Sequence, residues 1–130
     1  MSDNGHLRTP LKNVRGIGTG RGGTHHFIVQ RITAVALVPL CLWFVWIALE
    51  LLHLDYASAR ALIARPWNAV LMISFILAVF WHAQLGMQVV IEDYVTTHAL
   101  EIASQIVVKF LAVLGAVACT LAVVRIALGS

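Results

Sequence analysis

Charged side chains are scarce in this chain. Asp, Glu, Lys and Arg together make up 12% of its 130 residues, whereas 60% of the residues are hydrophobic. One domain of this length cannot bury so large an apolar fraction in a single core, so the scarcity of charge excludes an ordinary soluble protein. Composition alone therefore predicts a membrane protein.

Cysteine and proline are also rare, with two and three residues. Cys41 and Cys119 both lie in apolar runs and lack C-x-x-C spacing, which speaks against a disulfide or a metal pair and predicts two small, buried hydrophobic side chains. Pro39 lies inside the first apolar run and predicts a kink there. Pro66 marks the start of the second run.

In place of charge, the sequence has three long apolar runs, at residues 32–52, 67–91 and 110–128. Each approaches or exceeds the roughly 20 residues that a helix needs to cross about 30 Å of hydrocarbon. The runs also lack the alternation that is typical of barrel strands. We therefore expect an all-α integral membrane protein with three transmembrane helices.

The expected domain organisation follows from these runs. Residues 1–26 form a glycine- and arginine-rich segment, and residues 27–130 form a three-helix membrane domain. The expected helices cover 27–53, 67–95 and 104–128. The connection between the first two is expected to hold a turn of surface helix.

Positive charge predicts the orientation of the chain. Five of the nine Lys and Arg residues precede the first span: Arg8, Lys12, Arg15, Arg21 and Arg31. The positive-inside rule places this end in the cytoplasm, so three crossings put residues 54–66 and the C-terminus in the periplasm and residues 92–104 inside. No A-x-A-type site follows the first run, which is therefore predicted to be a retained helix in a bacterial inner membrane. The sequence has no basic patch interleaved with aromatic residues, so nothing in it indicates nucleic-acid binding.

His82 is the most informative residue, because it lies inside the second apolar run. An ionisable side chain in a membrane span is costly and usually marks a cofactor or a transport pathway. At 3.6 residues per turn, Gly86 lies about one turn from His82 and Asp93 about three turns from it, on nearly the same face. An imidazole beside a residue without a side chain suits a haem, whose flat macrocycle needs room near the helix.

Two other interpretations of this face stay open. His82 can be a core histidine that bonds to a neighbouring helix, and Gly86 can simply allow two helices to approach closely. The span has no second His, Cys or Asp at i+3 or i+4 from His82, so this chain cannot build a tetrahedral zinc site there. A six-coordinate haem iron would need its other axial ligand from another chain.

Asp93 and Tyr94 close the second span at the expected cytoplasmic surface. A phenol hydroxyl beside a carboxylate offers a quinone carbonyl a hydrogen-bond donor and a route for protons. An interfacial tyrosine and a loop acid explain the same residues without function. His25 and Arg31 are expected at about the depth of Asp93, where Arg31 either binds a haem propionate or anchors the span as a snorkelling cation.

Two motifs together are similar to a known family. The first runs His25-x-Phe27-Ile28-x-x-Arg31-x-Thr33-Ala34, and the second combines His82-Ala83-x-x-Gly86-Met87 with Asp93-Tyr94-Val95. They resemble the small hydrophobic membrane-anchor subunit of bacterial succinate dehydrogenase, which is respiratory complex II of the tricarboxylic acid cycle. The resemblance covers the first two spans and the three-helix plan, whereas the third span matches only in hydrophobicity.

The resemblance implies a role inside a complex. It implies a second membrane-anchor subunit, with which this chain forms a helical bundle around one haem b, and His82 as one axial ligand of the haem iron. Arg31 and His25 then lie in the haem propionate region, and Tyr94 and Asp93 belong to the ubiquinone site. FAD and the iron–sulfur clusters are expected only in the partner flavoprotein and iron–sulfur subunits.

Electrons then pass from succinate to ubiquinone, and this chain anchors the complex without oxidising succinate. It has neither a flavin fingerprint nor a cysteine cluster for iron–sulfur binding. The alternative function is a small helical transporter or channel subunit in which His82 relays protons. The spans show no inverted repeat and no acidic residue near mid-membrane that would pair with His82, which disfavours transport. A purely structural anchor without haem is a third interpretation.

Overall fold

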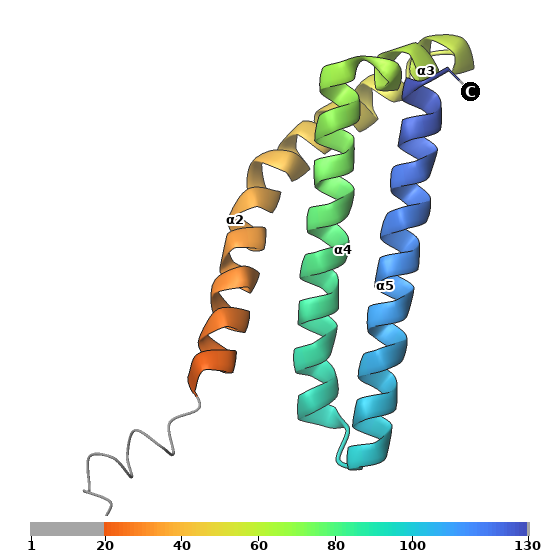
Figure 1. Ribbon diagram of the computed structural model, residues 1–130. Helices are drawn as coiled ribbons and strands as arrows, with labels where there is room; N and C mark the ends of the chain where they lie inside the picture. The colour runs from red at the N-terminus through yellow and green to blue at the C-terminus, as the bar shows by residue number, and fades with distance from the viewer. Residues whose placement is uncertain (1–19, 130) are drawn as a thin grey trace, which may run out of the picture.

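The computed structural model describes residues 20–129, which are helical except at the connections and at residues 128–129. Most of the expected segment 1–26, up to residue 19, lies outside the described residues. The described helices are α2 (Gly20–Leu51), α3 (Tyr56–Ala64), α4 (Pro66–Tyr94) and α5 (His98–Ala127) (Figure 1). Three stretches are long and apolar enough to cross a membrane: Thr24–Leu51, Pro66–Tyr94 and His98–Ala127. The expected all-α architecture with three spans is confirmed.

The helix ends differ from the expected ones. α2 already includes Gly20, where we expected a start near residue 27, and α5 begins at His98 rather than near 104. The expected inner loop 92–104 shrinks to a turn of three residues, 95–97. Hydropathy marks only the stretch that suits lipid, whereas a helix continues into polar sequence wherever its backbone hydrogen bonds can still form.

The connection between the first two spans is more regular than a single turn. It holds α3, a helix of nine residues that begins after Asp55. The nearby hydroxyl of Ser58 holds the pKa of the exposed Asp55 carboxyl below its ordinary value, because a hydrogen bond to the carboxylate favours the charged form. Pro66 occupies the first turn of α4, where its missing N–H costs no hydrogen bond.

α4 and α5 run antiparallel side by side, and α3 lies across one end of them (Figure 1). We call this the α3 end and the opposite one, at residues 95–97, the turn end. α2 packs against α4, and the Phe44 and Phe75 rings stack between them with centroids 4.5 Å apart and planes at 14°. Pro39 lies within α2 without ending it.

Little of this chain is buried. Among the described residues the buried apolar side chains are Ile47, Ala69, Leu85, Ile91 and Val123. Only 6 to 11% of the most apolar window of each span is covered. Apolar surface on this scale requires contact with lipid or with another protein.

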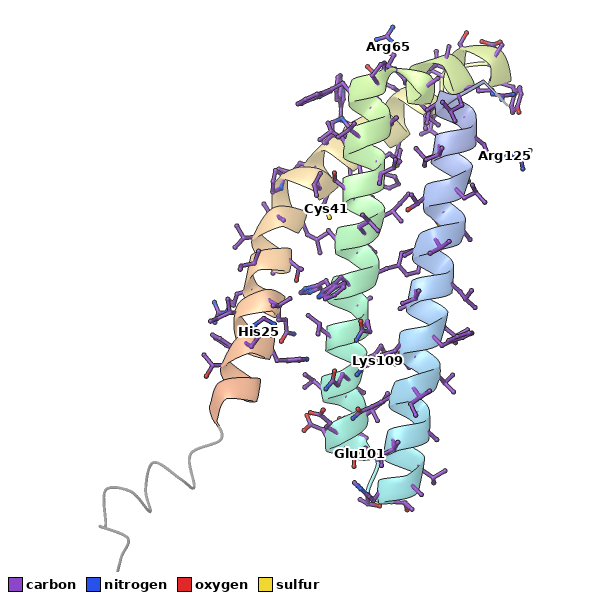
Figure 2. All side chains as sticks on the ribbon, in the orientation of Figure 1. His25, Cys41, Arg65, Glu101, Lys109 and Arg125 are labelled. Atoms are coloured by element: carbon purple, nitrogen blue, oxygen red, sulfur yellow. The ribbon has the colours of Figure 1, made fainter. Side chains whose placement is uncertain are left out.

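The expectation that both cysteines are buried is wrong. Cys41 and Cys119 are free but exposed, not buried as expected. Their apolar surroundings in the sequence could not show which helix face would lack a partner within the chain. Among the labelled charges, Arg65 and Arg125 lie near the α3 end and Glu101 near the turn end, whereas Lys109 lies part-way along α5 (Figure 2).

Candidate functional site

His82 makes a hydrogen bond between two spans. Its Nδ1 atom lies 3.1 Å from Oγ1 of Thr33, so a residue of α4 is linked to one of α2. The Thr33 hydroxyl also lies 3.0 Å from the carbonyl oxygen of Val29 and 2.9 Å from that of Gln30, one turn earlier in its own helix. Nε2 of His82 makes no hydrogen bond to any described residue. This atom is not buried within the described chain, so it remains accessible.

Gly86 leaves space beside α4, one turn from His82. A Cβ atom added at Gly86 would meet nothing within 4 Å. Gly115 on α5 is the opposite case, since a Cβ atom there would come within 2.8 Å of Cζ of Phe80. Gly115 therefore allows α4 and α5 to pack closely. No side chain of the described chain packs against Gly86 in this way.

The Thr33–His82 contact sets which residues of α2 and α4 share a level. Arg31 lies only about 3 Å along the axis from Thr33, whereas Asp93 lies about 16 Å from His82. The expectation that Arg31 lies at the depth of Asp93 therefore differs from the structure, which places Arg31 near the level of His82. His25, about 12 Å from Thr33, lies closer to the level of Asp93.

The structure does not bring Arg31 to the His82 ring. Arg31 is about 160° around the axis of α2 from Thr33, which faces α4. Its guanidinium lies over the Phe27 ring, with Cζ 5.0 Å from the ring centroid, an arrangement that cation–π attraction favours. Arg31 and His25 are both exposed.

Asp93 and Tyr94 lie at the turn end of α4. Both are exposed, and Tyr94 exposes 82% of its surface. Tyr94 is about 18 Å from His82 along the helix axis. The two residues can contribute a hydroxyl donor and a proton acceptor to a site, but any enclosing wall must come from elsewhere.

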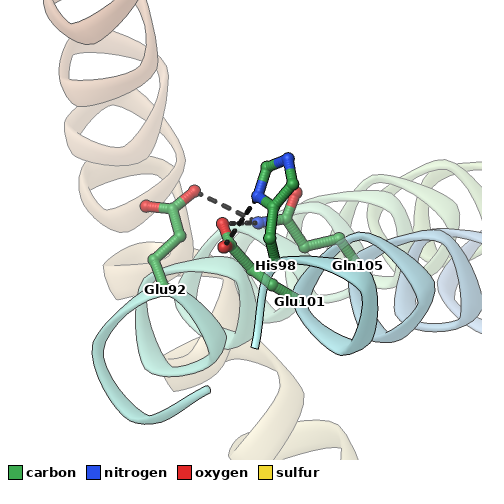
Figure 3. Close-up of polar contacts among 4 residues, drawn as sticks. All are labelled: Glu92, His98, Glu101 and Gln105. Atoms are coloured by element: carbon green, nitrogen blue, oxygen red, sulfur yellow. Dashed lines mark hydrogen bonds and ion pairs between the residues drawn. The ribbon is translucent and has the colours of Figure 1, made fainter. Parts of the chain in front are cut away.

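A cluster of polar side chains ties α4 to α5 next to Asp93. Gln105 on α5 donates from Nε2 to Oε1 of Glu92 and to Oε1 of Glu101, each at 3.4 Å, and Nδ1 of His98 lies 3.7 Å from Oε2 of Glu101 (Figure 3). Gln88 adds a bond of 2.9 Å to Glu92. These contacts link α4 to α5 at the turn end, where Asp93 and Tyr94 lie.

Thr33 is the residue whose role we did not expect from the sequence. It belongs to the first motif, but nothing there gave it a function. The only hint in the sequence was that Thr33 places a hydroxyl inside an apolar helix. The partner of that hydroxyl depends on the register between two helices, which the sequence does not show. His26 lies on nearly the same face of α2, and its Nε2 is buried without a hydrogen-bond partner among the described residues.

Comparison with known proteins identifies the family to which the chain belongs. The family model for the succinate dehydrogenase/fumarate reductase transmembrane subunit matches residues 6–124. The chain belongs to this family. Together with the three apolar helices, membership in the transmembrane subunit family makes it a multi-pass membrane protein. The resemblance of the two motifs is thus confirmed at the level of the family.

Relatives within the family match over nearly the full length. The succinate dehydrogenase hydrophobic membrane anchor subunit of Rickettsia bellii is 34% identical over 117 residues, which cover 90% of this chain and 94% of the relative. The subunit of the same name from Rickettsia conorii is 27% identical over 89% of this chain and 93% of its own. That of Rickettsia typhi is 30% identical over 81% and 84%.

Proposed function

We propose that this chain is the membrane-anchor subunit of a succinate:ubiquinone oxidoreductase. It docks the flavoprotein and iron–sulfur subunits to the membrane, supplies one axial ligand to haem b and forms part of the ubiquinone site. Its family and the names of its relatives support the anchor role. The exposed apolar faces of its spans support a neighbouring second anchor subunit, because a haem-binding bundle needs helices on both sides.

The observation that carries the haem assignment is the environment of the His82 side chain. Its Nδ1 is held by Thr33, its Nε2 has no described partner, and space is open at Gly86 one turn away. A single imidazole beside open space fits one axial position of a haem iron, and the partner anchor subunit would provide the other. Haem b would supply a one-electron redox centre within the membrane.

Arg31 and His25 are the residues proposed for the haem propionates. Arg31 can offer a planar fork of donors to a carboxylate. To do so its guanidinium would leave the Phe27 ring, where it now lies. His25 lies nearer the start of α2 and is free to turn toward the same groups, since it is exposed.

Asp93 and Tyr94 are proposed as the contribution of this chain to ubiquinone reduction. Reduction of ubiquinone to ubiquinol takes two electrons and two protons. The Tyr94 hydroxyl would donate a hydrogen bond to a quinone carbonyl oxygen and thereby stabilise the negative charge that electrons bring to it. Asp93 would accept and pass on protons beside it. The high exposure of Tyr94 in this chain fits a site that partner subunits complete.

The orientation of the chain follows the positive-inside rule. The arginine-rich N-terminal segment is proposed to lie in the cytoplasm and the C-terminus in the periplasm of a bacterial inner membrane. The turn end, with Tyr94, then faces the cytoplasm. Soluble subunits that oxidise succinate there would deliver electrons at the same surface.

Replacement of His82 tests the proposal. In the purified whole complex, His82→Ala is expected to abolish the difference spectrum of reduced against oxidised haem b while the subunits still assemble. His53→Ala is the matched control, because His53 is exposed in the turn after α2 and its ring bonds to the Leu49 carbonyl of that helix, not to another span. A full haem spectrum in His82→Ala would contradict the ligand assignment.

A further inference from the structure

The Thr33 hydroxyl has three oxygen or nitrogen neighbours but only one hydrogen. Two neighbours, the carbonyl oxygens of Val29 and Gln30 at 3.0 and 2.9 Å, can only accept. The third is Nδ1 of His82 at 3.1 Å, which can donate or accept according to the tautomer of the ring. The distribution of protons over this group decides which nitrogen of His82 is available to a ligand.

One distribution satisfies all three contacts. If the hydroxyl donates to its own helix, as Ser and Thr within helices commonly do, its lone pairs face His82 and accept a hydrogen bond from Nδ1–H. If it donated to Nδ1 instead, its lone pairs would face two carbonyl oxygens about 3 Å away without any hydrogen between them. The contacts therefore favour His82 with its proton on Nδ1 and a free lone pair on Nε2.

We infer that Thr33 is a positioning residue that holds His82 in the tautomer and ring orientation needed to present Nε2 to the haem iron. The inference rests on the proposed haem function. Histidine ligands of metals usually donate their other ring N–H to an oxygen, which fixes the ring and raises its basicity as a ligand. Here the oxygen comes from another span, so the packing of α2 on α4 also sets the ligand geometry.

The same hydrogen bond has an electronic effect that packing alone would not have. A more basic imidazole stabilises the ferric state more than the ferrous state, because ferric iron carries more positive charge. Loss of the Nδ1–H hydrogen bond should therefore raise the midpoint potential of the haem. Each tenfold preferential loss of ferric stabilisation corresponds to about 59 mV for one electron.

Substitutions of Thr33 in the whole complex test this inference. Thr33→Val keeps the branched shape and removes the hydroxyl, and Thr33→Ser restores a hydroxyl. We expect Thr33→Val to weaken haem retention by about 10- to 100-fold, a typical cost of losing such a partner, and to raise the midpoint potential. Thr33→Ser should return both quantities to near the wild-type values. Redox titration of the haem absorbance and haem content per complex are the measurements.

The controls separate this inference from the haem proposal. Thr120→Val makes the same change on α5, at a buried hydroxyl without a described partner, and should leave the midpoint potential unchanged. If Thr33→Val does not assemble, Thr33→Cys takes its place, since a thiol is a weak acceptor of similar size. A wild-type potential in these Thr33 variants, in a complex whose haem depends on His82, would overturn the role of Thr33 alone. Absence of His82-dependent haem in the unmodified complex would overturn both.

Discussion

His82 and Tyr94 lie at different depths on α4, and a different role is proposed for each. The imidazole faces another span inside the apolar region, whereas the phenol is almost fully exposed at the turn end. About 18 Å of helix separates them, a distance at which their substitutions should act independently. Single-residue variants can therefore separate haem binding from quinone chemistry.

We predict that Tyr94→Phe impairs quinone reduction without impairing succinate oxidation. Loss of a positioned proton donor or hydrogen-bond donor typically costs about 100-fold or more in rate. The measurement compares succinate:ubiquinone activity with reduction of an artificial dye by the soluble subunits. Tyr56→Phe is a matched control, because Tyr56 is 81% exposed but lies at the α3 end. Equal loss of both activities in Tyr94→Phe would contradict the quinone assignment.

At the scale of the helix, two glycines have different surroundings, one against a packed side chain and the other beside open space. Phe80 on α4 occupies the position that a side chain at Gly115 would need, whereas nothing lies near Gly86. The two residues look alike in the sequence, since each stands inside an apolar run. Only the neighbouring helix gives them different roles.

We predict that Gly115→Ala destabilises the packing of α4 on α5 by about 1–3 kcal/mol, the usual cost of overpacking. Gly86→Ala should be neutral or stabilising by up to about 1 kcal/mol, because alanine favours helix and meets no neighbour there. Thermal or denaturant unfolding in detergent, followed by circular dichroism, measures both. Equal stability of Gly115→Ala and the parent chain would show that Phe80 moves aside freely.

The sequence predicted each span but not how the spans meet. Hydropathy and length located three helices, and the cost of an imidazole in lipid singled out His82. The partner of His82 depends on the tilt and rotation of α2 against α4, which periodicity in one chain does not define. For the same reason Thr33 was not assigned a role, and Arg31 was expected at another level. The length of α3 also escaped prediction, because a nine-residue helix has too little apolar pattern of its own.

At the scale of the whole molecule, exposure is the dominant feature. The described chain buries few side chains, and its long apolar faces remain uncovered. The fold of one such chain is therefore sufficient to order three spans but not to enclose a cofactor or a quinone. The proposed haem and quinone sites would need the faces of other subunits, and the exposure of Tyr94 and Arg31 agrees with this.

We predict that a reporter joined to the C-terminus reaches the periplasm. Three spans and the proposed cytoplasmic N-terminus would place it there, so a C-terminal alkaline phosphatase fusion should be active and a green fluorescent protein fusion dark. Fusions after Thr97, at the turn end, should give the reverse pattern, because that turn follows two spans. Activity of the phosphatase fused after Thr97 would invert the proposed orientation and move Tyr94 away from the cytoplasm.

The turn of three residues between α4 and α5 also bears on how the chain is made. Because so little sequence separates them, the second and third spans emerge from the ribosome within seconds of each other, at about 5–20 residues per second. We expect them to enter the bilayer as a paired hairpin, with Gly115 already against Phe80. The contact of Thr33 with His82 then joins two separately inserted units. Ligand geometry at His82 would be a late event in biogenesis, completed only when the first span closes onto the hairpin.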